Sequence, residues 1–247
     1  MNTFRADLHV HTVLSPCADV EMIPPLIVSE ATAHGISLIA ITDHNASANV
    51  SAVQKAAQGT PLVVLPGMEL QTREEVHVLC LFDHLHQLER FQASVDAALP
   101  GTPNNAGYFG DQFVVDETGD FIQREERLLL TSTYFSLFEA WERVTEIGGL
   151  LIPAHVDRKA FGLFANLGLI PTDIPIEALE LSRHLHPDQA SAIYPQVAGY
   201  PLIQDGDVHR LDEFLGATIF QLDHPSISEI RLALHHRDGR SYQVEHR

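Results

Sequence analysis

The stretch from Thr3 to His11, Thr-Phe-Arg-Ala-Asp-Leu-His-Val-His, guides how the rest of the sequence is interpreted. Its apolar, β-prone residues end in two histidines that are separated by one position. In a β-strand, residues two apart point to the same side, so the imidazoles of His9 and His11 can reach one ion. Any strand with two histidines on one face fits this pattern. The stretch therefore predicts a strand, and it predicts a metal site only if other strands contribute ligands.

Similar apolar runs recur along the chain and alternate with stretches of helical character. Pro24 and Pro25 suit the first turn of a helix, and Gly35 and Gly148 suit a helix end. Alternation at this spacing predicts parallel strands joined by crossover helices, in a barrel or an open doubly wound sheet. The candidate strands are Thr3–His9, Ser37–Ile41, Leu62–Leu65, Val76–Phe82, Gly149–Ala154, Ile176–Leu181, Pro201–Ile203 and Ala217–Gln221, and the candidate helices are Pro24–His34, Ala48–Ala57, His84–Leu99, Tyr134–Ile147, Pro187–Ala192 and Ser226–His235.

Residues 100–131 interrupt this alternation with Gly, Pro, Asn and acidic residues. We expect an inserted excursion, with a hairpin near Gln112–Gln123, within a single domain that spans residues 1–247. A long insertion of this kind is either a substrate lid or tolerated surface, and the sequence leaves both open. The chain also lacks the GxGxxG and GxxxxGKS/T loops of nucleotide-cofactor sites.

The charge balance is strongly acidic, because 15 Lys and Arg residues against 33 Asp and Glu residues give a net charge of −18. A field of that sign repels nucleic-acid backbones and anionic membranes, so we expect neither as a partner. A small phosphorylated substrate remains compatible if metal ions reverse the local potential. Cys17 and Cys80 are too few for a disulfide framework, which is typical of reduced thiols in a cytoplasmic protein. No signal peptide or membrane span is recognisable, and the oligomeric state does not follow from the sequence.

Histidine is the compositional oddity, with 15 copies in 247 residues. Six predicted strands carry a His, Asp or Glu at or close to the carboxyl end, where α/β barrels build active sites. A lone histidine at a strand end is more often structural, but buried imidazoles and carboxylates gathered on one side are unfavourable unless cations compensate them. The pattern therefore predicts a metal cluster. The segments are Asp7–Thr12, Ile41–Asn45, Gly67–Glu69, Glu75–Leu79, Ala154–His155 and Asp207–His209.

These six segments resemble, in order and spacing, the successive motifs of the PHP (polymerase and histidinol phosphatase) family, from about Asp7 to Arg210. The resemblance implies a distorted TIM-like (β/α)7 barrel of the α/β class, up to three metal ions and phosphoesterase activity. It also implies that Glu69 bridges two ions. The implied ligands are His9, His11, Glu69 and Asp207 for one ion, Glu69, His77 and His155 for a second, and His44, His209 and an acidic residue for a third.

The acidic ligand of the third ion is where the sequence departs from the family pattern, because Ser-Pro-Cys-Ala-Asp at 15–19 replaces the usual Ser-Asp-Gly. Counting back from Pro24 places Asp19 at the acidic position, and Cys17 is the alternative. Mixed imidazole and carboxylate ligands favour two or three Mn²⁺, Zn²⁺ or Fe²⁺ ions over Mg²⁺, which prefers oxygen ligands and water.

The implied reaction is hydrolysis of a phosphate ester by a metal-bound hydroxide in a dinuclear or trinuclear centre. Glu69, His155 and Asp207 are the ligands that we expect to be central to catalysis. Arg158, three residues after His155, and Arg183, after the sixth predicted strand, are candidates for binding the substrate phosphate. A surface ion pair explains each arginine equally well.

Three other functions fit parts of the same pattern. An exonuclease acting on nucleic-acid ends would keep the metal site and change the substrate. An amidohydrolase would also use His-x-His on a barrel, but Lys55 and Lys159 end no strand and Glu69 takes the place of its bridging carboxylated lysine. A metal-binding accessory protein without catalysis is the third alternative. The identity of the substrate does not follow from the sequence.

Overall fold

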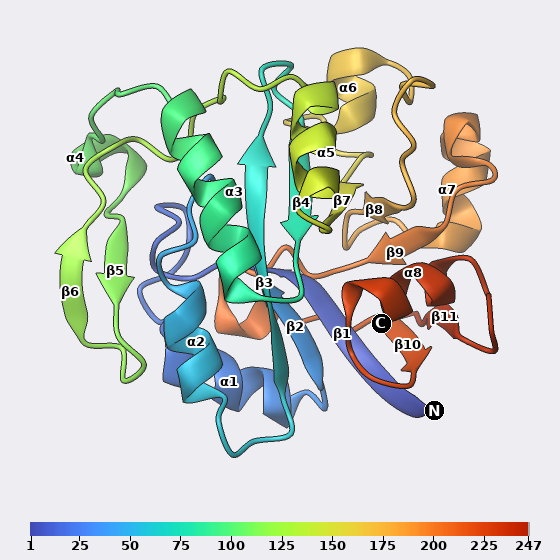
Figure 1. Ribbon diagram of the computed structural model, residues 1–247, viewed down its shortest axis with the longest axis horizontal. Coiled ribbons are helices and arrows are strands. Elements are labelled where there is room, and N and C mark those ends of the chain that lie inside the picture. The colour runs from blue at the N-terminus through green and yellow to red at the C-terminus, as the bar shows by residue number, and fades with distance from the viewer. Residues whose placement is uncertain (247) are drawn as a thin grey trace.

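The computed structural model of the chain describes residues 1–246 and has a seven-stranded sheet at its centre (Figure 1). The order of strands across this sheet is β11-β10-β1-β2-β3-β4-β7. Strands β8 and β9 pair in parallel beside it, and β5 and β6 form a separate hairpin. The strands are β1 (Asn2–Val10), β2 (Leu38–Ile41), β3 (Val63–Gln71), β4 (His77–Leu81), β5 (Phe113–Val115), β6 (Phe121–Arg124), β7 (Leu150–Pro153), β8 (Leu179–Leu181), β9 (Leu202–Gln204), β10 (Thr218–Leu222) and β11 (Ser241–Val244).

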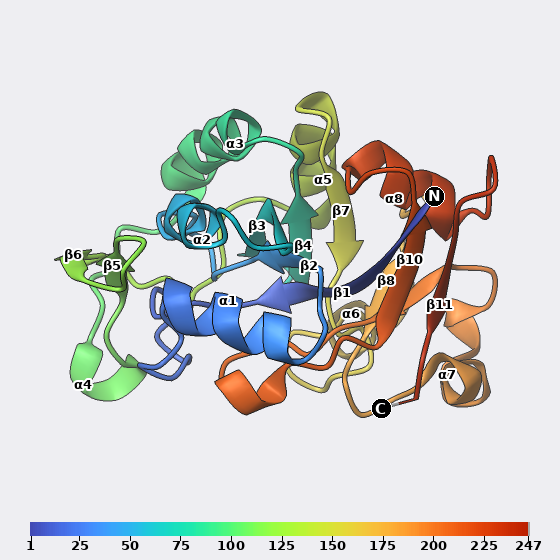
Figure 2. The ribbon, with the colours of Figure 1, turned by 90° about the horizontal axis from the view of Figure 1, so that it is seen from below.

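Strand directions in the central sheet are mixed. Strands β1, β2 and β3 run parallel, as expected, whereas β4 is antiparallel to β3 and to β7, and β10 is antiparallel to β1 and to β11. The expectation of parallel strands throughout is therefore wrong, since the link at 72–76 between β3 and β4 is too short for a crossover. The sheet curls into a half-barrel (Figure 2), so the α/β class is confirmed, and a regular (β/α)7 repeat stays a prediction.

Local sequence explains where two of the helices begin. Pro24 and Pro25 open α1, and Ser136 caps α5 by accepting a hydrogen bond from Glu139 N (3.2 Å), while the Glu139 carboxylate accepts one from Ser136 N (2.8 Å). Within residues 1–246, no helix is long and apolar enough to cross a membrane. The helices are α1 (Pro24–Ala33), α2 (Val50–Ala56), α3 (Leu85–Ala98), α4 (Ala106–Phe109), α5 (Leu137–Glu146), α6 (Leu163–Leu167), α7 (Pro187–Ile193) and α8 (Ile227–Leu234), with 3-10 turns at Pro195–Val197 and Leu211–Glu213.

Both faces of the central sheet are buried. In β2, Leu38 packs into one apolar cluster and Ile39 into another, because successive side chains of a strand point to opposite faces. The cluster of Leu38 contains Phe220 and residues of α8, and the cluster of Ile39 contains Phe91 of α3. Burial of both faces explains why β2 is a continuous apolar run. It also leaves the edge of the sheet as the place where polar side chains gather.

Residues 100–131 fold as an excursion at one end of the molecule, which consists of α4 and the β5–β6 hairpin (Figure 1). The hairpin expected near Gln112–Gln123 is therefore confirmed. Gly110 lies so close to Pro16 that a Cβ atom on it would be 2.3 Å from the Pro16 carbonyl oxygen. The excursion is thus packed tightly against the loop that follows β1.

Candidate metal centre

Eight of the nine sequence-predicted ligands converge at the edge of the sheet where β1, β2 and β3 end. Glu69, near the end of β3, lies among them. Its Oε1 atom is 2.8 Å from His77 Nδ1 and 3.1 Å from His155 Nε2, and its Oε2 atom is 2.8 Å from His44 Nδ1. The residues that the structure brings together are His9, His11, His44, Glu69, His77, His155, Asp207 and His209.

The mixed direction of the sheet explains how His77 reaches this edge. Sequence reasoning placed His77 near the carboxyl end of a strand, but it is the first residue of β4. Because β4 runs antiparallel to β3, its amino end lies beside the carboxyl end of β3, where His77 pairs with Gln71. The β3–β4 hairpin therefore brings His77 to the edge of the sheet to which the crossover helices bring the residues at the ends of the parallel strands.

The ring nitrogens of His9 and His11 face each other at a distance that two neutral imidazoles would not favour. Their Nε2 atoms are 3.1 Å apart. His9 Nδ1 lies 2.9 Å from a carboxylate oxygen of Glu180, so it carries a proton. His11 Nδ1 lies 2.8 Å from Ser15 Oγ, which donates its own proton to Asp43 Oδ1 at 2.7 Å, so His11 Nδ1 carries a proton too. In their neutral forms, both Nε2 atoms therefore present lone pairs to each other.

Two carboxylates point at the same pair of nitrogens. Asp207 Oδ1 is 3.3 Å from His9 Nε2 and 3.5 Å from His11 Nε2, and Glu69 Oε1 is 3.3 Å from His9 Nε2. Four electron-pair donors at one buried place repel one another unless positive charge lies among them. His77 Nε2 is also buried without a hydrogen-bond partner in the described part of the chain. The donor set therefore fits divalent ions that bind imidazole and carboxylate.

Protonation supplies part of this positive charge when no ion is bound. Burial opposes the charged form of His9, but Glu180, Glu69 and Asp207 overcome it and raise the pKa of His9 well above its usual value. Burial likewise opposes ionisation of Glu69, but the surrounding histidines hold its pKa well below the usual range. For His77, burial dominates over the nearby Glu69 and lowers the pKa to about 4. A metal ion has to displace the extra proton of His9 in order to bind.

Glu180 on β8 is a functional candidate that sequence reasoning missed. Its side chain is 1% exposed, accepts a hydrogen bond from His9 Nδ1, and accepts another from the backbone N–H of His155 at 2.9 Å. It therefore fixes the orientation of one predicted ligand and the backbone of another. The available signal was a carboxylate within the predicted strand Ile176–Leu181, which also contains Glu177, since an unpaired Glu is seldom buried.

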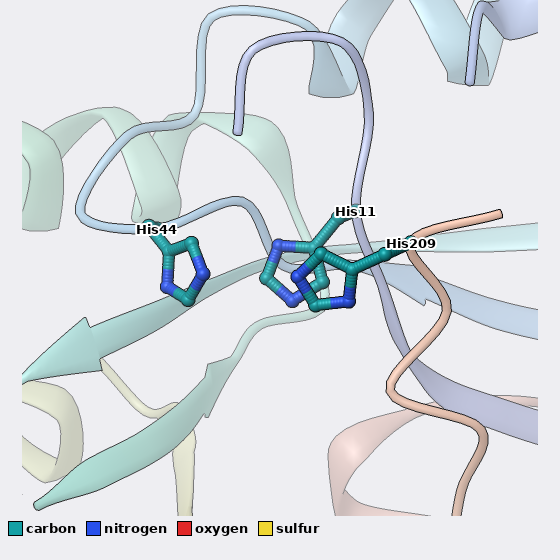
Figure 3. Close-up of side chains that lie close together, drawn as sticks. All are labelled: His11, His44 and His209. Carbon is teal, nitrogen blue, oxygen red and sulfur yellow. The ribbon is translucent and has the colours of Figure 1, made fainter. Parts of the chain in front are cut away.

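A second cluster consists of His11, His44 and His209, in which one ligand atom of each lies within 4.8 Å of the others (Figure 3). Cys17 lines the same cavity as His44 and His209; burial opposes ionisation of its thiol, but the two imidazoles lower the pKa of Cys17 to about 6. Asp19 is exposed, and its Oδ1 atom accepts a hydrogen bond from a backbone N–H two residues further along (3.2 Å). The structure therefore brings Cys17, and not Asp19, to the imidazoles within residues 1–246.

Arginines border the polar side of the centre. A cavity of about 410 Å³ is lined by Arg158, Arg183 and Arg210 together with Asp207 and His209. Arg158 Nη1 donates to Asp207 Oδ2, so the predicted phosphate-binding arginine pairs with a predicted metal ligand. Both arginines predicted from the sequence thus lie at the same cavity.

Aromatic side chains line an adjoining cavity, which shares Arg158, Asp207 and His209 with the first. A second cavity of about 370 Å³ is lined by Phe109 and Phe161 as well as by several of the histidines. The Phe161 ring stacks on the His77 ring, with centroids 4.4 Å apart and planes at 2°. Phe161, His155 and Asp207 have positive φ angles of 59°, 30° and 48°, a region that residues other than glycine seldom adopt. Strain of this kind is concentrated at functional sites.

Comparison with known proteins relates the chain to one family and several structures. The PHP domain family model matches residues 7–148, and no curated protein sequence matches the chain. The lesion-specific endonuclease PfuEndoQ of Pyrococcus furiosus has a similar structure (TM-score 0.73, 19% identity), over 98% of this chain and 58% of that one. Endonuclease Q in complex with a 27-mer duplex that carries an abasic lesion is also similar (0.71, 20%), over 96% and 57%. A candidate metal-dependent phosphoesterase of Bifidobacterium adolescentis matches less closely (0.57, 19%), over 83% and 87%.

These structures correct one expectation. The acidic charge balance was taken to exclude nucleic acid as a partner, but the fold of almost the whole chain is shared with an endonuclease that holds duplex DNA. Net charge sums ionisable groups over the entire surface, whereas phosphate binding depends on the groups around one cavity. Here three arginines line one cavity together with Asp207 and Glu213, so cationic groups are concentrated there in a way that the net charge of −18 does not reveal.

Proposed function

Since this chain belongs to the PHP family, whose model matches residues 7–148, we propose that it hydrolyses phosphate ester bonds with two or three divalent metal ions. The observation that carries the proposal is the facing pair of Nε2 atoms of His9 and His11, with carboxylate oxygens of Glu69 and Asp207 beside them. Bound divalent ions would supply Lewis acidity, which lowers the pKa of water and offsets negative charge on phosphate oxygens.

The protein's own residues would divide the work of holding these ions. Glu69, whose two oxygens face different histidines, suits a ligand shared between two ions. Its carboxylate, with His155 and Asp207, would then lie closest to the reacting phosphate. The proposed ligands are His9, His11, Glu69 and Asp207 for one ion, Glu69, His77 and His155 for a second, and His44 and His209 for a third.

We infer further that the substrate carries its phosphate ester next to an aromatic group, as a nucleotide or a nucleic-acid strand does. Arg183 and Arg158 on the polar side offer planar guanidinium groups that suit phosphate oxygens. Phe161 and Phe109 on the apolar side offer faces on which a base can stack. Phe109 belongs to the 100–131 excursion, so this segment would form one wall of the substrate site and not merely surface.

Asp207 and Arg158 would act as a pair. The carboxylate of Asp207 has two oxygens, of which Oδ1 faces the histidine nitrogens and Oδ2 accepts from Arg158. Asp207 therefore holds the guanidinium beside the metal centre before substrate arrives. A substrate phosphate could then contact Arg158 and the ions together, and Arg183 lines the same cavity.

The test combines metal content with activity on one sample. Protein purified without chelator is analysed for metals and assayed against mononucleotides, a sugar phosphate, and labelled single-stranded and duplex oligonucleotides, including one with an abasic site. We expect at least two equivalents of Mn, Fe or Zn, and hydrolysis of a nucleotide or oligonucleotide that chelation abolishes and metal restores. Less than one equivalent, without rescue by added metal, contradicts the metal centre. Full metal occupancy with no turnover across the panel indicates an accessory protein instead.

A matched pair of variants tests the phosphate contact. Arg183→Ala is expected to raise KM by about tenfold, in line with the loss of one charge-assisted contact of roughly 1.4 kcal/mol. Arg90→Ala, on the exposed face of α3, removes the same charge far from the cavity and is expected to leave KM unchanged. Equal effects of the two substitutions would indicate that only the overall charge matters.

A further inference from the structure

We propose that Cys17 supplies a sulfur ligand to the third metal ion, together with His44 and His209, in place of the carboxylate that the family pattern leads one to expect. The inference rests on the proposed metal centre and concerns which element of this chain completes it. It also goes beyond that centre, because a sulfur ligand changes which metals the site prefers.

The first observation is the convergence of side chains from three separate segments. The rings of His11 and His209 stack with centroids 4.0 Å apart, and those of His11 and His44 lie 4.6 Å apart (Figure 3). Cys17 lines both cavities at the centre, one of them together with His209 and the other together with His44 and His209. Cys17 therefore borders the same space as these two imidazoles, whereas Asp19 lines neither cavity.

The second observation is the way the loop is fixed. Backbone hydrogen bonds from Ser15 N to Thr12 O (3.0 Å) and from Ala18 N to Ser15 O (2.9 Å) wind the loop into consecutive turns. Asp19 N donates to His209 O at 2.8 Å, which ties the loop to the segment that carries one of the imidazoles. Both Cys17 and Asp19 are exposed residues of this loop, but only Cys17 lines the cavities at the centre.

The excursion holds this arrangement from the other side. Gly110 approaches the Pro16 carbonyl so closely that no side chain fits between them. The residue next to Pro16 is Cys17, so a displacement of the loop that would exchange Cys17 for Asp19 has to push the excursion away. The position of the thiol is thus set by contacts on both flanks, as expected of a ligand whose place is preorganised.

The chemistry distinguishes the two candidates. A cysteine binds metal as the thiolate, so coordination breaks the S–H bond, releases one proton to solvent and forms the metal–sulfur bond without any change of oxidation state. Thiolate is a soft ligand that suits Zn²⁺, Co²⁺ or Fe²⁺, whereas a carboxylate in the same place suits Mn²⁺ or Mg²⁺. We therefore expect the third site to prefer Zn²⁺ over Mn²⁺.

Cobalt provides the test, because Co²⁺ bound to thiolate has a strong near-ultraviolet charge-transfer band that Co²⁺ bound to oxygen lacks. Wild-type protein reconstituted with Co²⁺ is expected to show this band and about three equivalents of metal, the number that a trinuclear site holds. Cys17→Ser is expected to lose the band and about one equivalent while the other two sites stay occupied. Asp19→Asn is expected to retain both, and Cys17→Asp to recover the third equivalent without the band.

Thiol alkylation gives a second readout that does not depend on activity. Cys17 is expected to react with iodoacetamide after chelation and to be protected when metal is bound, whereas the fully buried Cys80 stays unreactive in both states. A band that survives in Cys17→Ser, or metal loss in Asp19→Asn with Cys17 intact, overturns the assignment and leaves the metal centre standing. Failure of wild-type protein to bind any Co²⁺ overturns the proposed function as well.

Discussion

Replacing Glu180 by Gln tests whether the carboxylate behind His9 sets the metal affinity. One oxygen of Glu180 accepts from His9 Nδ1 at 2.9 Å and the other accepts from His155 N at 2.9 Å, so both oxygens serve predicted ligands. Glutamine keeps only one acceptor oxygen and loses the charge that makes His9 a stronger donor to metal. Because partners of this kind change metal affinity by roughly 10- to 100-fold, and two contacts are affected at once, we expect about 100-fold weaker binding, or about 2.7 kcal/mol.

The assay is a competition titration of metal against a chromophoric chelator at constant pH, supported by thermal unfolding with and without metal. Glu177→Gln is the control, since Glu177 lies three residues earlier, is half-buried and pairs with Arg231 Nε at 2.9 Å away from the centre. We expect the control to bind metal as wild type does. An unchanged dissociation constant in the Glu180→Gln variant would refute the reasoning that this carboxylate tunes the site through His9.

Three further predictions follow from the same structure. Glu69→Gln is expected to lower kcat more than about tenfold, at least 1.4 kcal/mol in barrier, with an unchanged circular dichroism spectrum; retained turnover would contradict a shared ligand. Phe161→Ala removes the ring stacked on His77 and is expected to raise KM several-fold for nucleotides, by about 1 kcal/mol, but not for an aliphatic phosphate ester. Burial raises the pKa of Cys80 well above the ordinary value of a cysteine thiol, so at alkaline pH the thiol of the unfolded chain ionises first. The free energy of unfolding of wild type, measured in urea, should then fall by about 1.4 kcal/mol per pH unit relative to that of Cys80→Ala. The same pH dependence in both proteins would exclude this linkage.

The convergence of ligands could be predicted from the sequence because it depends on local pattern. His9 and His11 lie two apart in a strand, and His44 and Glu69 follow the next two apolar runs, so parallel pairing alone brings them to one edge. Their burial follows from the same pattern, since apolar residues cover both faces of the strands. The α/β class was predictable for the same reason.

Neither the direction of β4 nor the place of Glu180 beside the centre can be predicted from the hydrophobic pattern of the sequence. Periodicity identifies a strand but not its direction, and only the short link at 72–76 indicated a hairpin. Glu177 and Glu180 both lie in the predicted strand Ile176–Leu181, and either is compatible with a solvated face until β8 is placed beside the centre. The loop that carries Cys17 and Asp19 packs at Pro16 against Gly110, over 90 residues away, and a count along the chain cannot include that contact.

The net charge of the chain led to the wrong prediction that nucleic acid is not a partner, because it is a property of the whole surface and not of the metal centre. At physiological ionic strength, charges separated by more than about 8 Å of solvent are largely screened, so most of the 33 acidic residues do not act on a phosphate at the metal centre. The charged groups nearest to such a phosphate would be Arg158, Arg183 and Arg210, the carboxylates of Asp207 and Glu213 in the same cavity, and divalent ions, each of which would add two positive charges. The acidic surface would still repel a long polyanion at a distance, which slows encounter without weakening the contacts made at the centre. An acidic chain can therefore act on a nucleic-acid phosphate when metal ions and a few arginines define the potential where the bond is broken.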